Sequence, residues 1–93
     1  MPAYTPYILE ETSLAADVAS QWAIVLYNDE VNTFDWVIEC LIHYCGHDAL
    51  QAEQCAWLVH TKGKYAVKTG DLEEMIPVCS ALCDQGLSAR LEQ

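Results

Sequence analysis

An abrupt change in the spacing of apolar residues is the feature that most constrains how this 93-residue chain can fold. The apolar run from Trp22 to Tyr27 stops at the polar residues 28–30. Apolar side chains then recur at positions 34, 37, 38, 41 and 45, the spacing of one helix face. The sequence therefore predicts a strand, a polar turn and a helix in quick succession. Because the strand is apolar on both faces, we expect it to be central in a small sheet or covered on both sides.

Two helices come after this turn, and each has signals at its ends. The first is predicted over about 33–45, and Asn32 or Thr33 can cap it by accepting from its free N–H groups. The second is predicted over about 49–61. Gly46 ends the first helix, Asp48 caps the start of the second, and Gly63 ends the second.

The last third of the chain predicts a strand, a helix and a strand. Residues 65–68 and 87–91 alternate as short strands. Between them lies an apolar helical stripe, made of Leu72, Met75, Ile76, Cys79, Leu82 and Cys83. Pro77 falls inside this pattern, so the helix either begins near Glu74 or is kinked at the proline.

The order of these elements predicts an α+β fold. We expect a single small sandwich with the order β-α-α-β-α-β, in which three helices pack on a three-stranded antiparallel sheet. This core domain is predicted over residues 21–93. Residues 1–20 carry two prolines and no sustained period, and we interpret them as a flexible N-terminal tail.

Composition excludes several classes of partner. The net charge is −10 and all the Lys and Arg residues lie at position 62 or later, so phosphate backbones are repelled and nucleic acid is not an expected partner. The charge suits either cationic partners or simple solubility. The sequence contains no run of eighteen apolar residues, so we do not expect a membrane span. The five cysteines are odd in number and lie in amphipathic stretches, which indicates reduced, buried thiols in a cytoplasmic protein.

Metal binding and catalysis are the alternatives to a binding module. His43 and His47 are four residues apart, as are Cys79 and Cys83, which resembles ligand spacing on a helix. However, Gly46 interrupts the helix between the histidines, and both cysteines belong to the apolar stripe. Surface histidines and core cysteines are therefore the favoured interpretation, with no metal or cofactor. No cysteine opens a helix at a polar turn, where its pKa would fall, so we do not expect an enzyme.

The polar turn is the candidate binding site. Asn28 and Asp29 have no evident structural duty there, and as hydrogen-bond acceptors they suit a cation or an ammonium group. A short connection between the two helices should return His60 to the neighbourhood of this turn. These polar side chains would then have apolar neighbours, namely Phe34, Val37, Ala56 and Val59. A small apolar hollow with acceptors at its rim suits a chain-terminal ammonium that carries a large apolar side chain.

These residues resemble the ClpS family, bacterial adaptor proteins that feed substrates to the Clp ATP-dependent protease. The resemblance covers about residues 22–92. Its most specific pieces are Val25-Leu26-Tyr27-Asn28-Asp29-Glu30, Phe34-Asp35-Trp36-Val37-Ile38, Val59-His60-x-x-Gly63-Lys64 and Leu91-Glu92. The resemblance implies the same β-α-α-β-α-β fold behind a flexible tail. It also implies binding of N-end-rule substrates, which begin with Leu, Phe, Tyr or Trp and have a free α-amine.

The resemblance also assigns roles to individual residues. It implies that Asn28, Asp29 and His60 bind the substrate α-amine. It places the side-chain pocket at Asn32, Phe34, Val37, Leu41, Ala56 and Val59. Many family members have Thr-Pro-Met where this chain has residues 32–34, and a Met is common at the position of Ala56. These departures change the shape of the pocket and leave the amine-binding residues intact.

The partners implied by the resemblance are N-end-rule substrate proteins and a Clp AAA+ ATPase of the ClpA or ClpC type. In the family the flexible tail engages that ATPase. The alternative is a small regulatory domain that binds a peptide or a metal and has no link to proteolysis. A Phe-initiated peptide, compared with the same peptide acetylated, distinguishes the two.

Overall fold

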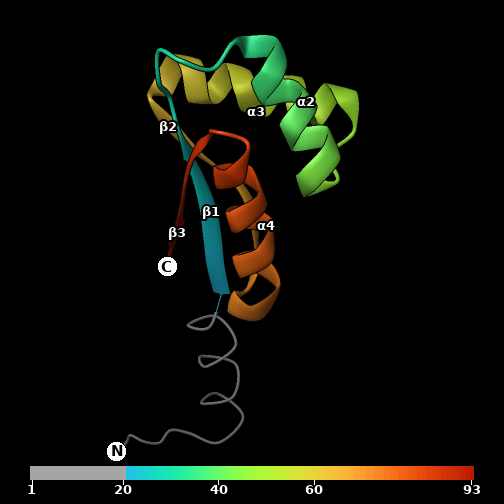
Figure 1. Ribbon diagram of the computed structural model, residues 1–93, viewed down its shortest axis with the longest axis vertical. Helices are drawn as coiled ribbons and strands as arrows, with labels where there is room; N and C mark the ends of the chain where they lie inside the picture. The colour runs from blue at the N-terminus through green and yellow to red at the C-terminus, as the bar shows by residue number, and fades with distance from the viewer. Residues whose placement is uncertain (1–20) are drawn as a thin grey trace, which may run out of the picture.

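A computed structural model of the protein describes residues 21–93, which form three strands and three helices (Figure 1). The elements are β1 (Gln21–Tyr27), α2 (Phe34–Cys45), α3 (Ala49–Lys62), β2 (Lys64–Asp71), α4 (Leu72–Asp84) and β3 (Ser88–Glu92). The predicted order β-α-α-β-α-β is therefore confirmed. The predicted flexible tail, residues 1–20, lies outside the described residues. None of the helices within residues 21–93 has the length and apolar character needed to cross a membrane.

The sheet has the strand order β2-β1-β3, and β1 is antiparallel to both neighbours. The central place predicted for the first strand is thus confirmed. Ile24 and Leu26 of β1 are almost completely buried. They share the core with apolar side chains from the helices, and the largest fully buried ones among these are Cys40, Leu41 and Leu82.

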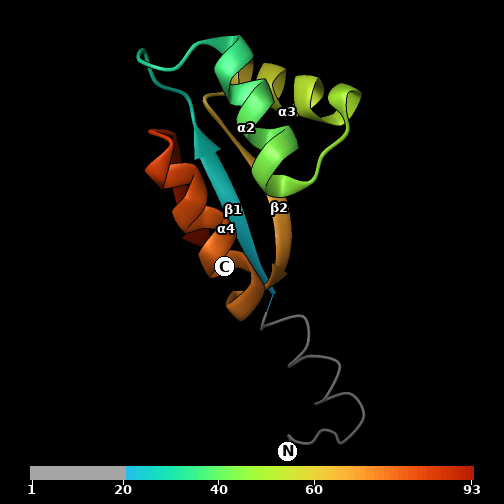
Figure 2. The ribbon, with the colours of Figure 1, turned by 45° about the vertical axis from the view of Figure 1, so that its right-hand side comes forward.

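The helices take two different positions relative to the sheet. α4 runs along the sheet beside β1, whereas α2 and α3 form a hairpin at the end where β1 finishes (Figures 1 and 2). The turn after β1 therefore lies next to the start of α2 and close to the last turn of α3. Any ligand site built by the polar turn must be completed by this helical hairpin.

The predicted helix ends are present, and Thr33 rather than Asn32 caps α2. The Thr33 hydroxyl accepts a hydrogen bond from the Trp36 backbone N–H at 3.1 Å. Gly46 ends α2 in the left-handed conformation, with φ of 74°. Asp48 opens α3 by accepting from the Gln51 N–H at 2.8 Å. Because these bonds satisfy N–H groups that a helix leaves unpaired, they fix where each helix begins.

We expect Thr33→Ala to lower the free energy of unfolding by about 1 kcal/mol, because the first turn of α2 loses its side-chain cap. Urea denaturation followed by circular dichroism measures this change. Thr33→Ser keeps the hydroxyl and should remain close to the wild-type protein. Equal stability of all three proteins would show that the cap contributes nothing.

The third helix differs from its prediction in two ways. α4 begins at Leu72 and continues through Pro77, so a start near Glu74 is wrong. Pro77 has no backbone N–H to donate to the carbonyl of the preceding turn. Because Pro77 is exposed, water can donate to that carbonyl instead. The buried stripe is also narrower than predicted: Cys83 is exposed, and its thiol lies 3.3 Å from the Ala89 carbonyl oxygen.

His47 is buried, which corrects its interpretation as a surface histidine. The side chain is only 7% exposed, and its Nδ1 atom has no hydrogen-bond partner within residues 21–93. Burial lowers the pKa of His47 because the charged imidazolium is poorly solvated; a hydrogen bond with the Val67 backbone opposes the effect and nearby Lys68 adds to it. The residue therefore belongs to the structural connection between α2 and α3.

Candidate ligand-binding site

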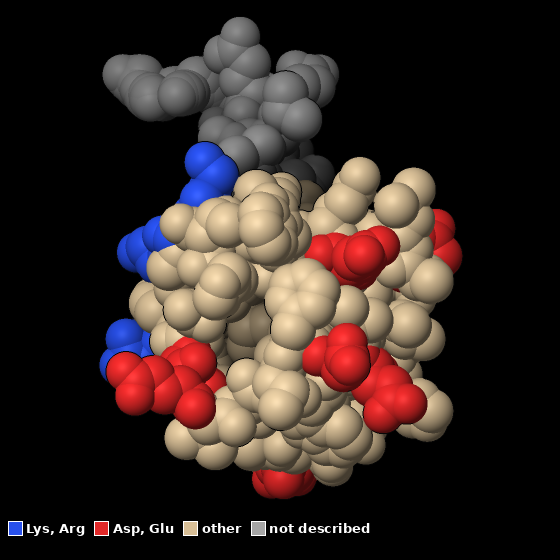
Figure 3. Space-filling model, turned by 90° about the horizontal axis from the view of Figure 1, so that it is seen from above, with Lys and Arg blue, Asp and Glu red and all other residues tan. Residues whose placement is uncertain are grey.

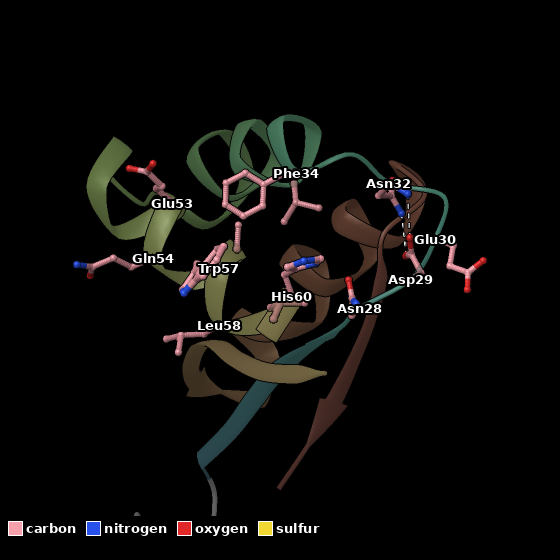
Figure 4. Close-up of a pocket in the computed structure, with 13 residues that line it drawn as sticks. Asn28, Asp29, Glu30, Asn32, Phe34, Glu53, Gln54, Trp57, Leu58 and His60 are labelled. Carbon is pink, nitrogen blue, oxygen red and sulfur yellow. Dashed lines mark hydrogen bonds between the residues drawn. The ribbon is translucent and has the colours of Figure 1, made fainter. Parts of the chain in front are cut away.

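A cavity of about 1100 Å³ opens between the polar turn, the start of α2 and one face of α3 (Figure 4). Its lining consists of Asn28, Asp29, Glu30, Asn32, Phe34, Val37, Glu53, Gln54, Ala56, Trp57, Leu58, Val59 and His60. Seen from above, this end of the molecule is hollowed near its centre, and the Lys and Arg side chains lie to one side (Figure 3). The volume is slightly above the range for pockets that hold drug-sized ligands, about 300–1,000 Å³.

The turn that ends α3 brings His60 to the polar turn. Gly63 lies just after α3 in the left-handed conformation, with φ of 91°, and its carbonyl accepts from the Asn28 backbone N–H at 2.9 Å. This bond joins the end of β1 to the end of α3. Asn28, Asp29 and His60 consequently line one cavity, as the sequence predicted.

Asp29 has a structural duty that the sequence did not indicate. Its Oδ1 atom accepts from the backbone N–H groups of Val31 and Asn32, at 2.9 and 2.8 Å. Its Oδ2 atom accepts from Asn32 Nδ2 and Ser88 Oγ, both at 2.9 Å. A carboxylate has about four acceptor positions, so these bonds use its capacity. Asp29 can therefore offer a ligand its charge, whereas direct hydrogen bonds would come from other groups.

These hydrogen bonds also keep Asp29 ionised. Partial burial raises the pKa of this carboxyl, but the bonds from Asn32, Ser88 and Val31 outweigh burial and hold the pKa below its usual value. The turn thus presents a permanent negative charge beside the cavity at neutral pH.

The loop formed by the polar turn, between β1 and α2, is hydrogen-bonded to the turn between α4 and β3, which is far away in sequence. Asn32 Nδ2 donates to the Gly86 carbonyl at 2.9 Å as well as to Asp29. Trp36 Nε1 donates to the Gln85 carbonyl at 3.2 Å. The acceptors in the distant turn are the backbone carbonyl oxygens of Gly86 and Gln85, which no local sequence pattern indicated.

Asn28 and His60 are available for hydrogen bonding to a ligand. Both side chains are exposed, and neither makes a hydrogen bond to another residue of the range 21–93. In Figure 4 the two side chains lie near one another at the polar end of the cavity. One amide and one imidazole beside the Asp29 carboxylate form an arrangement suited to an ammonium group.

All the residues predicted to form the apolar pocket line the cavity except Leu41. Val37, Ala56 and Val59 line the cavity, and Ala56 and Val59 are buried. Phe34 stands at its mouth, 38% exposed. Leu41 does not line the cavity, because its side chain is 0% exposed and belongs to the core.

Sequence reasoning missed the continuation of the cavity along α3. Glu53, Gln54, Trp57 and Leu58 also line it. A signal for part of this set exists, because positions 53, 57 and 60 are one and two helical turns apart and share a face of α3. The apolar residues of α3 that the sequence singled out, Ala56 and Val59, indicated only the buried part of the lining.

Comparisons with known proteins agree on the kind of protein that carries this site. A family model described as "ATP-dependent Clp protease adaptor protein ClpS" matches residues 17–90. The Streptomyces coelicolor protein "ATP-dependent Clp protease adapter protein ClpS" is 31% identical over 91 residues, covering 91% of this chain and 95% of that protein. The protein of the same name from Streptomyces avermitilis is 31% identical over 94 residues, covering 95% and 90%.

A solved structure matches the fold. Agrobacterium tumefaciens ClpS2, whose structure was determined bound to L-phenylalaninamide, superposes with a TM-score of 0.75 at 15% identity, over 78% of this chain and 95% of that one. At this identity the likeness supports the three-helix, three-strand architecture. Together with the family model and the curated relatives, it leads to one conclusion: the chain belongs to the ClpS family, the adaptor proteins of the ATP-dependent Clp protease.

Proposed function

We propose that the cavity binds the first residue of N-end-rule substrates, those that begin with Leu, Phe, Tyr or Trp and have a free α-amine. The observation that carries this proposal is the polar end of the cavity, where the unpaired groups of Asn28 and His60 lie beside the ionised Asp29. The ligand of the Agrobacterium tumefaciens protein supports it, because phenylalaninamide combines an aromatic side chain with a free amine.

Recognition depends on two complementary parts of the cavity. The substrate ammonium bonds the Asn28 amide oxygen and a ring nitrogen of His60, and the Asp29 charge attracts it. Hydrogen bonds to a charged group contribute about 1.5–3 kcal/mol each. The first side chain enters the apolar part lined by Val37, Ala56 and Val59. No bond of the substrate is made or broken, so the chain acts as a binding module without enzymatic activity of its own.

Bound substrates are then delivered to a Clp AAA+ ATPase of the ClpA or ClpC type. The cavity occupies one end of the domain, and the described chain begins at Gln21 at the opposite end of the sheet (Figure 1). The domain can thus hold its cargo at the end opposite to the one where residues 1–20 join it. The competing function is a peptide- or metal-binding regulator unconnected with proteolysis; within residues 21–93 no three His, Cys, Asp or Glu side chains are grouped for a metal ion.

The test is a titration with a fluorescent peptide that begins with Phe, compared with the same peptide acetylated at its α-amine. Acetylation removes the charge and the donors, so we expect affinity to fall by more than about tenfold. The composition control is a peptide made of the same residues with the Phe moved to the fifth position. Equal binding of the free and acetylated peptides would refute the proposed function.

The mouth of the cavity should exclude first residues that branch at Cβ. The Phe34 ring packs edge-on against Trp57, with centroids 6.5 Å apart and an interplanar angle of 83°, so it is held in place. A branched first residue cannot rotate clear of a fixed ring. We expect Ile- and Val-initiated peptides to bind roughly tenfold more weakly than a Leu-initiated peptide. Phe34→Met, with a flexible side chain, should narrow that difference. Equal affinity for Ile and Leu in the wild-type protein would contradict the argument.

A further inference from the structure

The cavity is longer than one residue requires. The amine-binding groups occupy one end, whereas Glu53 and Gln54 stand at the other (Figure 4). Glu53 and His60 are seven positions apart on α3, which corresponds to about 10 Å along the helix axis. An extended peptide advances about 3.5 Å per residue. A first residue bound at Asn28 and His60 therefore leaves a part of the cavity for the second residue of the substrate.

This second part of the cavity combines an aromatic face with a carboxylate. Trp57 is 58% exposed, yet its ring is braced on two sides. It packs against Phe34, and its centroid lies 6.1 Å from that of His60. Glu53 lies one helical turn before Trp57, which places the two side chains on one face of α3. Within the described part of the chain, Glu53 forms no hydrogen bond or ion pair.

The charge of the lining selects the ligand. The described residues around the cavity include Asp29, Glu30 and Glu53, and none of them is Lys or Arg. A cation over the face of a tryptophan is attracted by the ring, and a nearby carboxylate adds an ion pair. Arginine suits both partners, because its planar guanidinium stacks on aromatic rings and bonds a carboxylate with two N–H groups.

We propose that Glu53 and Trp57 form a second subsite that binds the side chain of the substrate's second residue and favours arginine there. The inference rests on the proposed function, since it assumes that the first residue is held by Asn28 and His60. Trp57 provides the surface on which the guanidinium stacks, and Glu53 accepts its hydrogen bonds. The subsite makes the chain selective among substrates that share the same first residue.

The experiment compares three peptides, two that carry one arginine at different positions and one that carries none. The first begins Phe-Arg, the second begins Phe-Gln, and the third begins Phe-Gln and carries the arginine at the fifth position. Fluorescence anisotropy measures their dissociation constants. We expect the Phe-Arg peptide to bind roughly fivefold more tightly than the other two, the combined effect of an exposed cation–π contact and an ion pair. The third peptide controls for general attraction to an acidic protein.

Variants assign the effect to the two residues. Glu53→Gln and Trp57→Leu should each remove most of the preference for arginine. The preference is measured as the ratio of the Phe-Gln to the Phe-Arg dissociation constant. Because both peptides begin with Phe, a change in the affinity for the first residue cancels in this ratio. Glu39→Gln removes a carboxylate from an exposed position of α2 outside the cavity and should leave the ratio unchanged.

Two results would overturn the subsite: equal binding of the Phe-Arg peptide and its fifth-position isomer, or a preference that persists in both α3 variants. Failure of the proposed function has a different signature, because the Phe-Gln peptide would then bind no better than its acetylated form. The two failures are therefore separable in one set of titrations.

Discussion

Replacing Asp29 with alanine is expected to weaken binding of a Phe-initiated peptide by roughly tenfold or more, because the substrate ammonium loses the charge that attracts it. A second effect accompanies the first. Asp29 accepts hydrogen bonds from Val31, Asn32 and Ser88, so the alanine variant also loses the bonds that shape the loop. We expect its free energy of unfolding to fall by about 1–2 kcal/mol, since these bonds are only partly shielded from water.

Matched variants separate charge from loop shape. Ser88→Ala removes one bond to Asp29 and keeps the carboxylate, so its peptide affinity should stay near that of the wild-type protein. Asp29→Asn keeps an oxygen that can accept the two backbone bonds but removes the charge, so its affinity should fall close to that of the alanine variant. Peptide anisotropy and urea denaturation measure the two effects. If Asp29→Ala binds the peptide as tightly as the wild-type protein, Asp29 plays no part in recognising the amine.

Removing residues 1–19 is expected to abolish delivery and leave recognition intact. The groups proposed to bind the α-amine lie between residues 28 and 60, so the affinity for a Phe-initiated peptide should not change. Degradation of an N-end-rule substrate by the cognate Clp ATPase and peptidase should nevertheless fall to the rate seen without adaptor. This combination is expected if the domain holds cargo while the N-terminal segment engages the ATPase.

The control for this experiment is a chain of full length in which residues 1–19 are replaced by a Gly/Ser sequence. A linker of that composition behaves as a flexible coil and preserves length without the natural side chains. Restored degradation would show that length suffices, whereas continued loss would assign the role to the sequence itself. Delivery by the truncated chain at the full rate would refute a role for the segment.

The sequence predicted those parts of the fold that have local signals. Thr33, Gly46, Asp48 and Gly63 mark helix ends through bonds to their own neighbours, and the structure has them where they were expected. Features set by distant contacts were not predictable in this way. His47 sits beside a glycine and an aspartate, like a surface residue, but packing against β2 buries it.

The same division applies to the site. The convergence of Asn28 and His60 was predictable from a short helical connection, and the structure contains it. The full bonding of Asp29 depends on Ser88, 59 positions away, and no spacing in the sequence relates the two residues. Trp57 could not be singled out, because a polar helix face with one aromatic residue is an ordinary surface pattern.

The fastening of the loop to the turn between α4 and β3 has a consequence for the kinetics of binding. Asn32 bonds the Gly86 carbonyl and Trp36 bonds the Gln85 carbonyl, so the loop holds its shape before a ligand arrives. A preorganised receptor loses little conformational entropy on binding, and encounter need not wait for a rearrangement. Under the proposed function, association should then be governed by diffusion and charge, whereas the residence time of a cargo protein should depend on the contacts of its own first residues. A receptor of that kind would sample many chain ends rapidly and retain only the few that fit.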